Sequence, residues 1–108
     1  MLSEEKMKKL QFNNYQEKVE ESSGVKLIKF GASWCGPCRH MLPFWKRQNK
    51  LNGKFEFFEV DVDEEPELSA KFQVRSVPAT FIVKNGQIVK SFVGMQNSST
   101  IMEVLEKA

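Results

Sequence analysis

The sequence predicts an α/β protein with one mixed, five-stranded sheet and helices on both of its faces. Three observations favour this class: strand-like apolar runs alternate with helix-like segments, Val25–Ala32 is almost continuously apolar, and Asn85-Gly86 separates the last two strand-like runs. A strand that is apolar throughout is typical of a sheet covered on both faces, and Asn-Gly is a strong signal for a two-residue hairpin turn. We therefore expect the order βαβαβαββα, with parallel strands joined by crossover helices and an antiparallel edge.

The first half of the chain contains two predicted strand–helix units. A short strand at Leu10–Phe12 precedes a helix over Tyr15–Ser22, for which Asn13 or Asn14 supplies the N-cap. The apolar strand 25–32 then leads by a tight connection into a long helix from Cys35 to about residue 51.

The second half adds a third unit, a hairpin and a last helix. Pro66 predicts the start of the short helix, because proline is tolerated in the first turn. The C-terminal helix is amphipathic and follows a cap at Asn97 or Ser98. The predicted elements are a strand at Phe55–Val62, a helix from Pro66 to about Phe72, strands at Val77–Val83 and Gln87–Val93, and the C-terminal helix.

The composition fits one globular domain. The chain has 108 residues, of which 41% are apolar and 28% charged, and we expect a single domain spanning residues 1–108. The net charge of +2 is too small to predict a nucleic-acid or anionic-membrane partner. Residues 1–7 hold acids and no apolar run of signal-peptide length, and no segment approaches the roughly 20 apolar residues of a membrane span. These features predict a cytoplasmic protein.

The only two cysteines, Cys35 and Cys38, lie three positions apart at the start of the predicted long helix. Free N–H groups and the helix dipole stabilise a thiolate there, and a second thiol one turn away can resolve a mixed disulfide. Zinc needs four ligands, and only His40 remains among the usual soft donors. The residues favour a redox dithiol over a metal site or a pair of inert buried side chains.

The pentapeptide Trp34-Cys35-Gly36-Pro37-Cys38 resembles the active-site motif of the thioredoxin family. The likeness extends over essentially the whole chain, through Pro43, Val77-Pro78, Lys84-Asn85-Gly86 and Val93-Gly94. The resemblance implies the thioredoxin fold and a protein-disulfide reductase with no bound metal or organic cofactor. It also implies electrons from a separate thioredoxin reductase, disulfide-containing proteins as substrates, and a monomer.

The resemblance implies a role for each residue of the motif. Cys35 would attack a substrate disulfide, and Cys38 would resolve the mixed disulfide and leave a Cys35–Cys38 bond. Gly36 and Pro37 would fix the turn, and glycine would let a substrate backbone approach closely. Trp34 would form an exposed aromatic lip, although a Trp at a strand end can also belong to the core.

A substrate groove is also implied beside the dithiol. Val77-Pro78 resembles the cis-proline loop of the family, whereas the sequence alone would favour a trans bond because cis X-Pro bonds are uncommon. The backbone of Val77 would pair with an extended substrate segment as an added strand. Val93-Gly94 would form the third side of this groove.

Two positions depart from the family pattern. Lys29 stands where an Asp lies beneath the dithiol, and Glu59 stands on the neighbouring strand where a Lys is usual. We expect Lys29 and Glu59 to form a charge-swapped pair that handles the Cys38 proton, unless both side chains reach solvent. Gly31 replaces a common Trp and leaves space that Phe44 or Trp45 would fill, but we expect both of these to be ordinary core residues.

Other functions are compatible with the same fold. An oxidant or isomerase is disfavoured by the Gly-Pro insert and by the lack of an export signal. The remaining alternative is a binding module or a chaperone subunit of a complex, with redox activity secondary.

Overall fold

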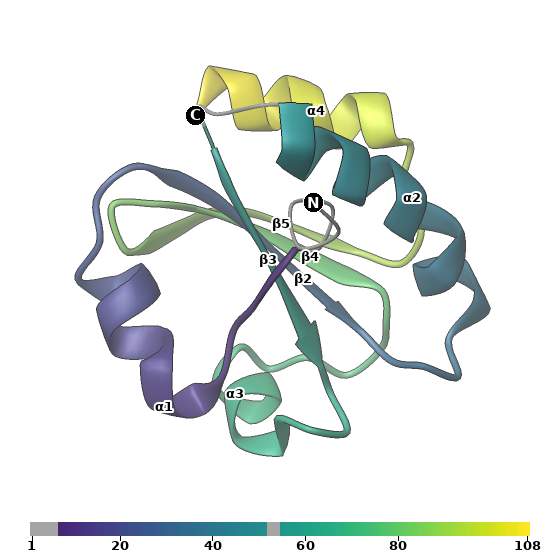
Figure 1. Ribbon diagram of the computed structural model, residues 1–108, viewed down its shortest axis with the longest axis horizontal. Helices are drawn as coiled ribbons and strands as arrows, with labels where there is room; N and C mark the ends of the chain where they lie inside the picture. Colours follow the sequence, from purple (N-terminus) through teal and green to yellow (C-terminus); the bar gives the residue numbers. More distant parts are fainter. Residues whose placement is uncertain (1–6, 52–54) are drawn as a thin grey trace.

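The computed structural model describes residues 7–51 and 55–108, the side chains of 49–51 excepted. The predicted absence of a signal peptide rests largely on residues 1–6, which lie outside these ranges. The elements, drawn in Figure 1, are β1 (Lys8–Lys9), α1 (Phe12–Tyr15), the π-helical segment η2 (Gln16–Glu20), β2 (Val25–Gly31), α2 (Gly36–Leu51), β3 (Glu56–Asp61), α3 (Pro66–Lys71), β4 (Ala79–Lys84), β5 (Gln87–Val93) and α4 (Ser98–Lys107). This order confirms the predicted succession of elements.

The strands form one mixed sheet in the order β1-β3-β2-β4-β5. The β1/β3 and β2/β3 pairs are parallel, whereas β2/β4 and β4/β5 are antiparallel. The predicted sheet is confirmed in its class and strand number. Its antiparallel part is larger than an edge alone, because β4 lies directly beside the central strand β2.

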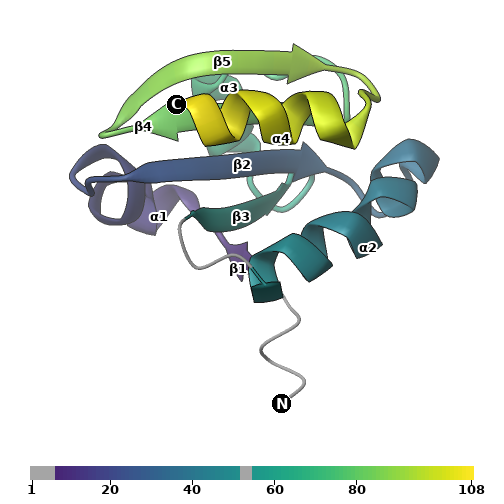
Figure 2. The same cartoon turned by 90° about the horizontal axis from the view of Figure 1, so that it is seen from above.

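Helices cover both faces of the sheet: Figure 1 shows α2 and α4 above it and α1 and α3 below it, and Figure 2 views the sheet from the side of α2 and α4. One core packs α1, η2 and α3 against the sheet around residues such as Ile28, Phe30 and Phe58. The other packs α2 and α4 around Leu27, Trp45 and neighbouring side chains. Successive strand residues point to opposite faces, so Lys29 and Glu59 share the α2 face with Leu27 and Phe57.

The predicted first strand at Leu10–Phe12 is wrong. The strand is Lys8–Lys9, and Phe12 already begins α1. The backbone N–H of Gln11 donates to Asn14 Oδ1 at 3.0 Å, so Gln11 is the N-cap in place of Asn13 or Asn14. This local hydrogen bond starts the helix earlier than the apolar pattern predicts.

Two predicted local signals are confirmed. Asn85 and Gly86 form the two-residue turn between Lys84 and Gln87, with φ of 51° and 84°. The Asn97 side chain caps α4 by accepting from the Ser99 N–H at 3.0 Å. Among the residues described, none of the helices is both long and apolar enough to cross a membrane.

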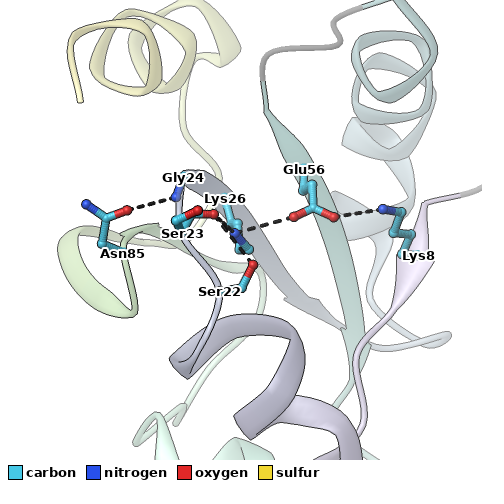
Figure 3. Close-up of polar contacts among 7 residues, drawn as sticks. All are labelled: Lys8, Ser22, Ser23, Gly24, Lys26, Glu56 and Asn85. Atoms are coloured by element: carbon cyan, nitrogen blue, oxygen red, sulfur yellow. Dashed lines mark hydrogen bonds and ion pairs between the residues drawn. The ribbon is translucent and has the colours of Figure 1, made fainter.

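A fully buried lysine lies on the α1 face of β2. Lys26 is 1% exposed, and its Nζ donates to the Ser23 carbonyl at 2.6 Å and lies 3.3 Å from Glu56 Oε1. Glu56 also accepts from Lys8 Nζ at 2.8 Å, so one carboxylate joins strands β1, β2 and β3 (Figure 3). Burial of Glu56 raises its pKa, but the two lysines outweigh this effect and the net pKa is lowered. The pairing supplies a counter-charge that a buried ammonium needs.

Candidate active site

The two cysteines lie at the junction of β2 and α2. The Cys35 N–H donates to the Ala32 carbonyl at 3.1 Å, which closes the tight connection before the helix. Cys35 and Cys38 form a disulfide with their Cα atoms 5.3 Å apart, and the Cys38 N–H donates to Cys35 Sγ at 3.2 Å. Cys35 is 4% and Cys38 3% exposed, so exposure alone does not distinguish the two sulfurs. The i, i+3 spacing on a helix brings them together.

The mouth of the site is formed by Trp34. Its side chain is 68% exposed, and its indole N–H donates to Asp63 Oδ2 at 2.8 Å. Asp63 belongs to the loop after β3, where its N–H donates to Asp61 Oδ1 at 2.8 Å. The hydrogen bond therefore holds an exposed aromatic ring beside the disulfide. Asp63 was not among the predicted site residues. Because β3 is parallel to β2, the loop that holds Asp63 and the start of α2 lie at the same edge of the sheet.

The loop before β4 faces the disulfide. The Val77–Pro78 peptide bond is cis, as the resemblance implies, and Val77 packs against the cluster of Ala32, Cys35 and Cys38. The Gly94 N–H donates to the Pro78 carbonyl at 2.8 Å, which brings the end of β5 to this loop. Val93 is 65% exposed.

Space for a partner exists at two glycines of this surface. A Cβ at Gly36 or at Gly94 would meet no atom within 4 Å. Gly36 lies between the two cysteines in sequence, and Gly94 is joined to the cis-proline loop by its hydrogen bond to Pro78. Pro37 lies exposed in the first turn of α2. An extended chain can approach a backbone most closely where glycine leaves it uncovered.

Lys29 and Glu59 are direct neighbours across β2 and β3. Lys29 is 5% exposed, whereas Glu59 is partly exposed. No ion pair within 4.0 Å joins them among the described residues. Burial lowers the pKa of Lys29, and the nearby Glu59 carboxylate opposes this effect in part. Lys29 Nζ and Cys38 Sγ each lie 3.3 Å from the point where a Gly31 Cβ would stand, so the amine lies next to the second cysteine.

The comparisons with known proteins agree with this geometry. The family model described as Thioredoxin matches residues 6–107. The chain belongs to the thioredoxin family. It is 40% identical over 96 residues to a thioredoxin of Staphylococcus haemolyticus, and the match covers 88% of this chain and 90% of the relative. It is also 40% identical over 95 residues to a thioredoxin of Staphylococcus aureus, with 87% of this chain and 89% of the relative covered. Among solved structures it is similar to a single-site mutant thioredoxin from Halobacterium salinarum, with a TM-score of 0.84, 26% identity, and coverage of 95% and 90%.

Family and geometry together give the chemistry. The protein is a thioredoxin-fold protein-disulfide oxidoreductase whose redox-active group is the Cys35–Cys38 disulfide. Within the described ranges, no three His, Cys, Asp or Glu side chains are grouped to hold a metal ion. His40 and Arg39 are exposed on α2.

The space at Gly31 is not filled by an aromatic side chain. Trp45 is fully buried and packs against Phe44 and Phe57 in the core under α2 and α4. A cavity of about 230 Å³ remains, lined by Gly31, Lys29 and Cys38 among others. Phe44 and Trp45 are core residues, as expected, and neither fills this space, because both rings pack in the core under α2 and α4.

Proposed function

We propose that this chain is a general protein-disulfide reductase, formed by a single domain over residues 1–108. The observation that carries the proposal is the Cys35–Cys38 disulfide at the N-terminus of α2, bordered by Trp34, the cis-proline loop and Gly94. The N-terminal end of a helix favours thiolate over thiol. The reaction therefore uses the dithiol form, in which both sulfurs are available for exchange.

The proposed reaction passes two electrons from the dithiol to a substrate. The Cys35 thiolate attacks one sulfur of a substrate disulfide, which forms a Cys35–substrate disulfide and releases one substrate thiolate. The Cys38 thiolate then attacks Cys35 Sγ, which forms the Cys35–Cys38 disulfide and releases the second substrate thiolate. A separate thioredoxin reductase would return the electrons, and no bound metal or organic cofactor is required.

The substrate segment is proposed to bind as an extended strand. Val77 would offer backbone groups to it, and Pro78 would shape the loop. Val93 and Gly94 would form the far wall, while Trp34, Gly36 and Pro37 would contact the segment beside the reacting sulfur. The exposure of Trp34 and Val93 and the open space at Gly36 and Gly94 support this arrangement.

Lys29 and Glu59 are proposed to handle the proton of Cys38. The Lys29 amine lies beside Cys38, so its positive charge favours the Cys38 thiolate. Glu59, its neighbour across the strands, would accept the proton directly or through a water molecule. Burial lowers the pKa of Lys29, so a Cys38 thiolate beside it would stabilise the ammonium form.

Insulin reduction with dithiothreitol tests the reductase function. The wild type should accelerate the precipitation of insulin chains, and Cys35→Ser should not. An inactive wild type would refute the reductase and favour a binding module or chaperone subunit. The proposal also includes a cytoplasmic location and a monomeric state, and sedimentation of the purified protein tests the latter.

A further inference from the structure

The cavity beside Cys38 has the size of a small-molecule site. Its volume of about 230 Å³ exceeds that of an engineered apolar cavity of about 150 Å³ that binds benzene. Gly31 keeps it open, because a Cβ there would lie 3.3 Å from both Cys38 Sγ and Lys29 Nζ. The apolar part of its lining comes from residues of the β1–α1 connection, the end of β2, α2 and β3: Leu10, Ala32, Leu42 and Val60.

A buried amine lies in this cavity without a partner. The Lys29 side chain is 95% buried, since 5% of it is exposed. In the described part of the chain, no residue accepts a hydrogen bond from Lys29 Nζ or pairs with it within 4.0 Å. Burial lowers the pKa of Lys29, and the nearby Glu59 carboxylate offsets this effect only in part. The amine can therefore gain an acceptor from a bound molecule.

The lining holds three cations and four carboxylates, so its overall charge does not by itself select an anion. Two of its four carboxylates are already used, because Asp61 accepts from the N–H groups of Asp63 and Glu64, and Glu65 accepts from that of Phe12. The remaining charged residues are the cations Lys9, Lys29 and Arg39 and the acids Glu59 and Glu64. Lys9 and Arg39 are exposed to solvent, whereas Lys29 is buried and has no hydrogen-bond acceptor among the described residues. An anion is therefore favoured at Lys29 itself.

We propose that this cavity binds a small organic carboxylate with an apolar, ring-sized body, whose carboxylate pairs with Lys29. The body lies against Leu42 and the wall that Gly31 leaves open, next to Cys38. A carboxylate on Lys29 competes with the Cys38 thiolate for the same ammonium. The disulfide form therefore binds the carboxylate more tightly than the dithiol form does, and bound carboxylate makes the disulfide harder to reduce.

Calorimetry with three molecules of one shape tests the site without using reductase activity. The probes are phenylacetate, neutral phenylacetamide and cationic phenethylamine, each titrated into the wild-type disulfide form. Phenylacetate should bind at one site, about tenfold more tightly than the amide, because it makes a charge-assisted hydrogen bond. Phenethylamine should bind most weakly of the three probes. The dithiol form should bind phenylacetate at least about threefold more weakly than the disulfide form does.

Variants locate the bound probe. Gly31→Leu and Leu42→Trp each enlarge a side chain that lines the cavity, one at the end of β2 and one on α2, so each should abolish phenylacetate binding. Lys29→Met should leave the cavity open but remove the preference for acid over amide. Val89→Trp on exposed β5 is the matched control and should bind as the wild type does. The proposal is overturned by absent saturable binding, by equal binding to both redox forms, or by an acid preference that survives Lys29→Met.

Discussion

Replacing Lys29 by methionine removes the positive charge beside Cys38 and keeps a side chain of similar length. The two interacting atoms, Lys29 Nζ and Cys38 Sγ, each lie 3.3 Å from one point, the Cβ position of Gly31. The two atoms therefore lie within about 6.6 Å of each other, where unit charges attract by at least about 2.5 kcal/mol at an effective dielectric constant of about 20. The cavity beside them opens to solvent and weakens this attraction. We therefore expect Lys29→Met to raise the pKa of the Cys38 thiol by one to two units, about 1.4–2.8 kcal/mol.

The assay is a pH titration of the Cys38 Cβ carbon by NMR in a Cys35→Ser background, which leaves one thiol. Lys29→Arg keeps the charge and should give a Cys38 pKa near that of the parent. Lys90→Met, the same change on exposed β5, is the control and should have no effect. At neutral pH, with both cysteines present, Lys29→Met should slow the resolving step by about threefold per unit of pKa shift, because a smaller thiolate fraction is partly offset by a more nucleophilic thiolate. A shift below about 0.3 units, or an equal shift in Lys90→Met, would refute the proposed charge effect.

Three further predictions concern stability and the mouth of the site. Glu56→Gln should lower the free energy of unfolding by about 1–3 kcal/mol at pH 7, because buried Lys26 loses its carboxylate partner. The pKa of Glu56 is lowered in the folded state, so its contribution to stability is present above the unfolded pKa of about 4.3 and is lost as the pH falls. The free energy of unfolding, measured with denaturant, should therefore change less between pH 7 and pH 3 in Glu56→Gln than in the wild type. An equal change in both proteins would contradict this. Gly86→Ala should destabilise the protein by at least about 2 kcal/mol, because its φ is +84° and a Cβ would lie 2.5 Å from the Glu20 carbonyl oxygen. Gly94→Ala, with φ of +81° and no atom within 4 Å, is the control and should cost about 1 kcal/mol in thermal unfolding; equal losses would show that the contact is unimportant. Asp63→Ala should free the indole at the mouth and lower kcat/KM for insulin about fivefold without changing stability, and an unchanged kcat/KM would exclude a role for that hydrogen bond.

Sequence patterns predicted the features that depend on local chemistry. Asn85-Gly86 tolerates the positive φ of a hairpin turn, and Asn97 supplies a short side chain that caps α4. The continuous apolar run at β2 indicated a strand covered on both faces. The positions of the two cysteines at the start of α2 followed from the same patterns.

Features that depend on tertiary packing were not predictable in this way. The first strand was misplaced because two residues of β1 gain their stability from pairing with β3, which local pattern does not contain. The register of β2 and β3 makes Lys29 and Glu59 neighbours. Among the described residues the two side chains do not form an ion pair within 4.0 Å, and this depends on side-chain packing that the sequence pattern does not contain. Whether Gly31 leaves a cavity depends on how Trp45 packs, and only the assembled core determines that.

The central claim is that Cys35 attacks the substrate disulfide and Cys38 resolves the mixed disulfide. Trapping of the mixed disulfide tests it most directly. Reduced Cys38→Ser and reduced Cys35→Ser are each mixed with a peptide that contains one disulfide, and intact masses are measured over time. We predict that Cys38→Ser accumulates a stable adduct through Cys35, because no second thiol resolves it, whereas Cys35→Ser forms little or none. An adduct that accumulates on Cys35→Ser and not on Cys38→Ser would contradict the assignment of Cys35 as the nucleophile.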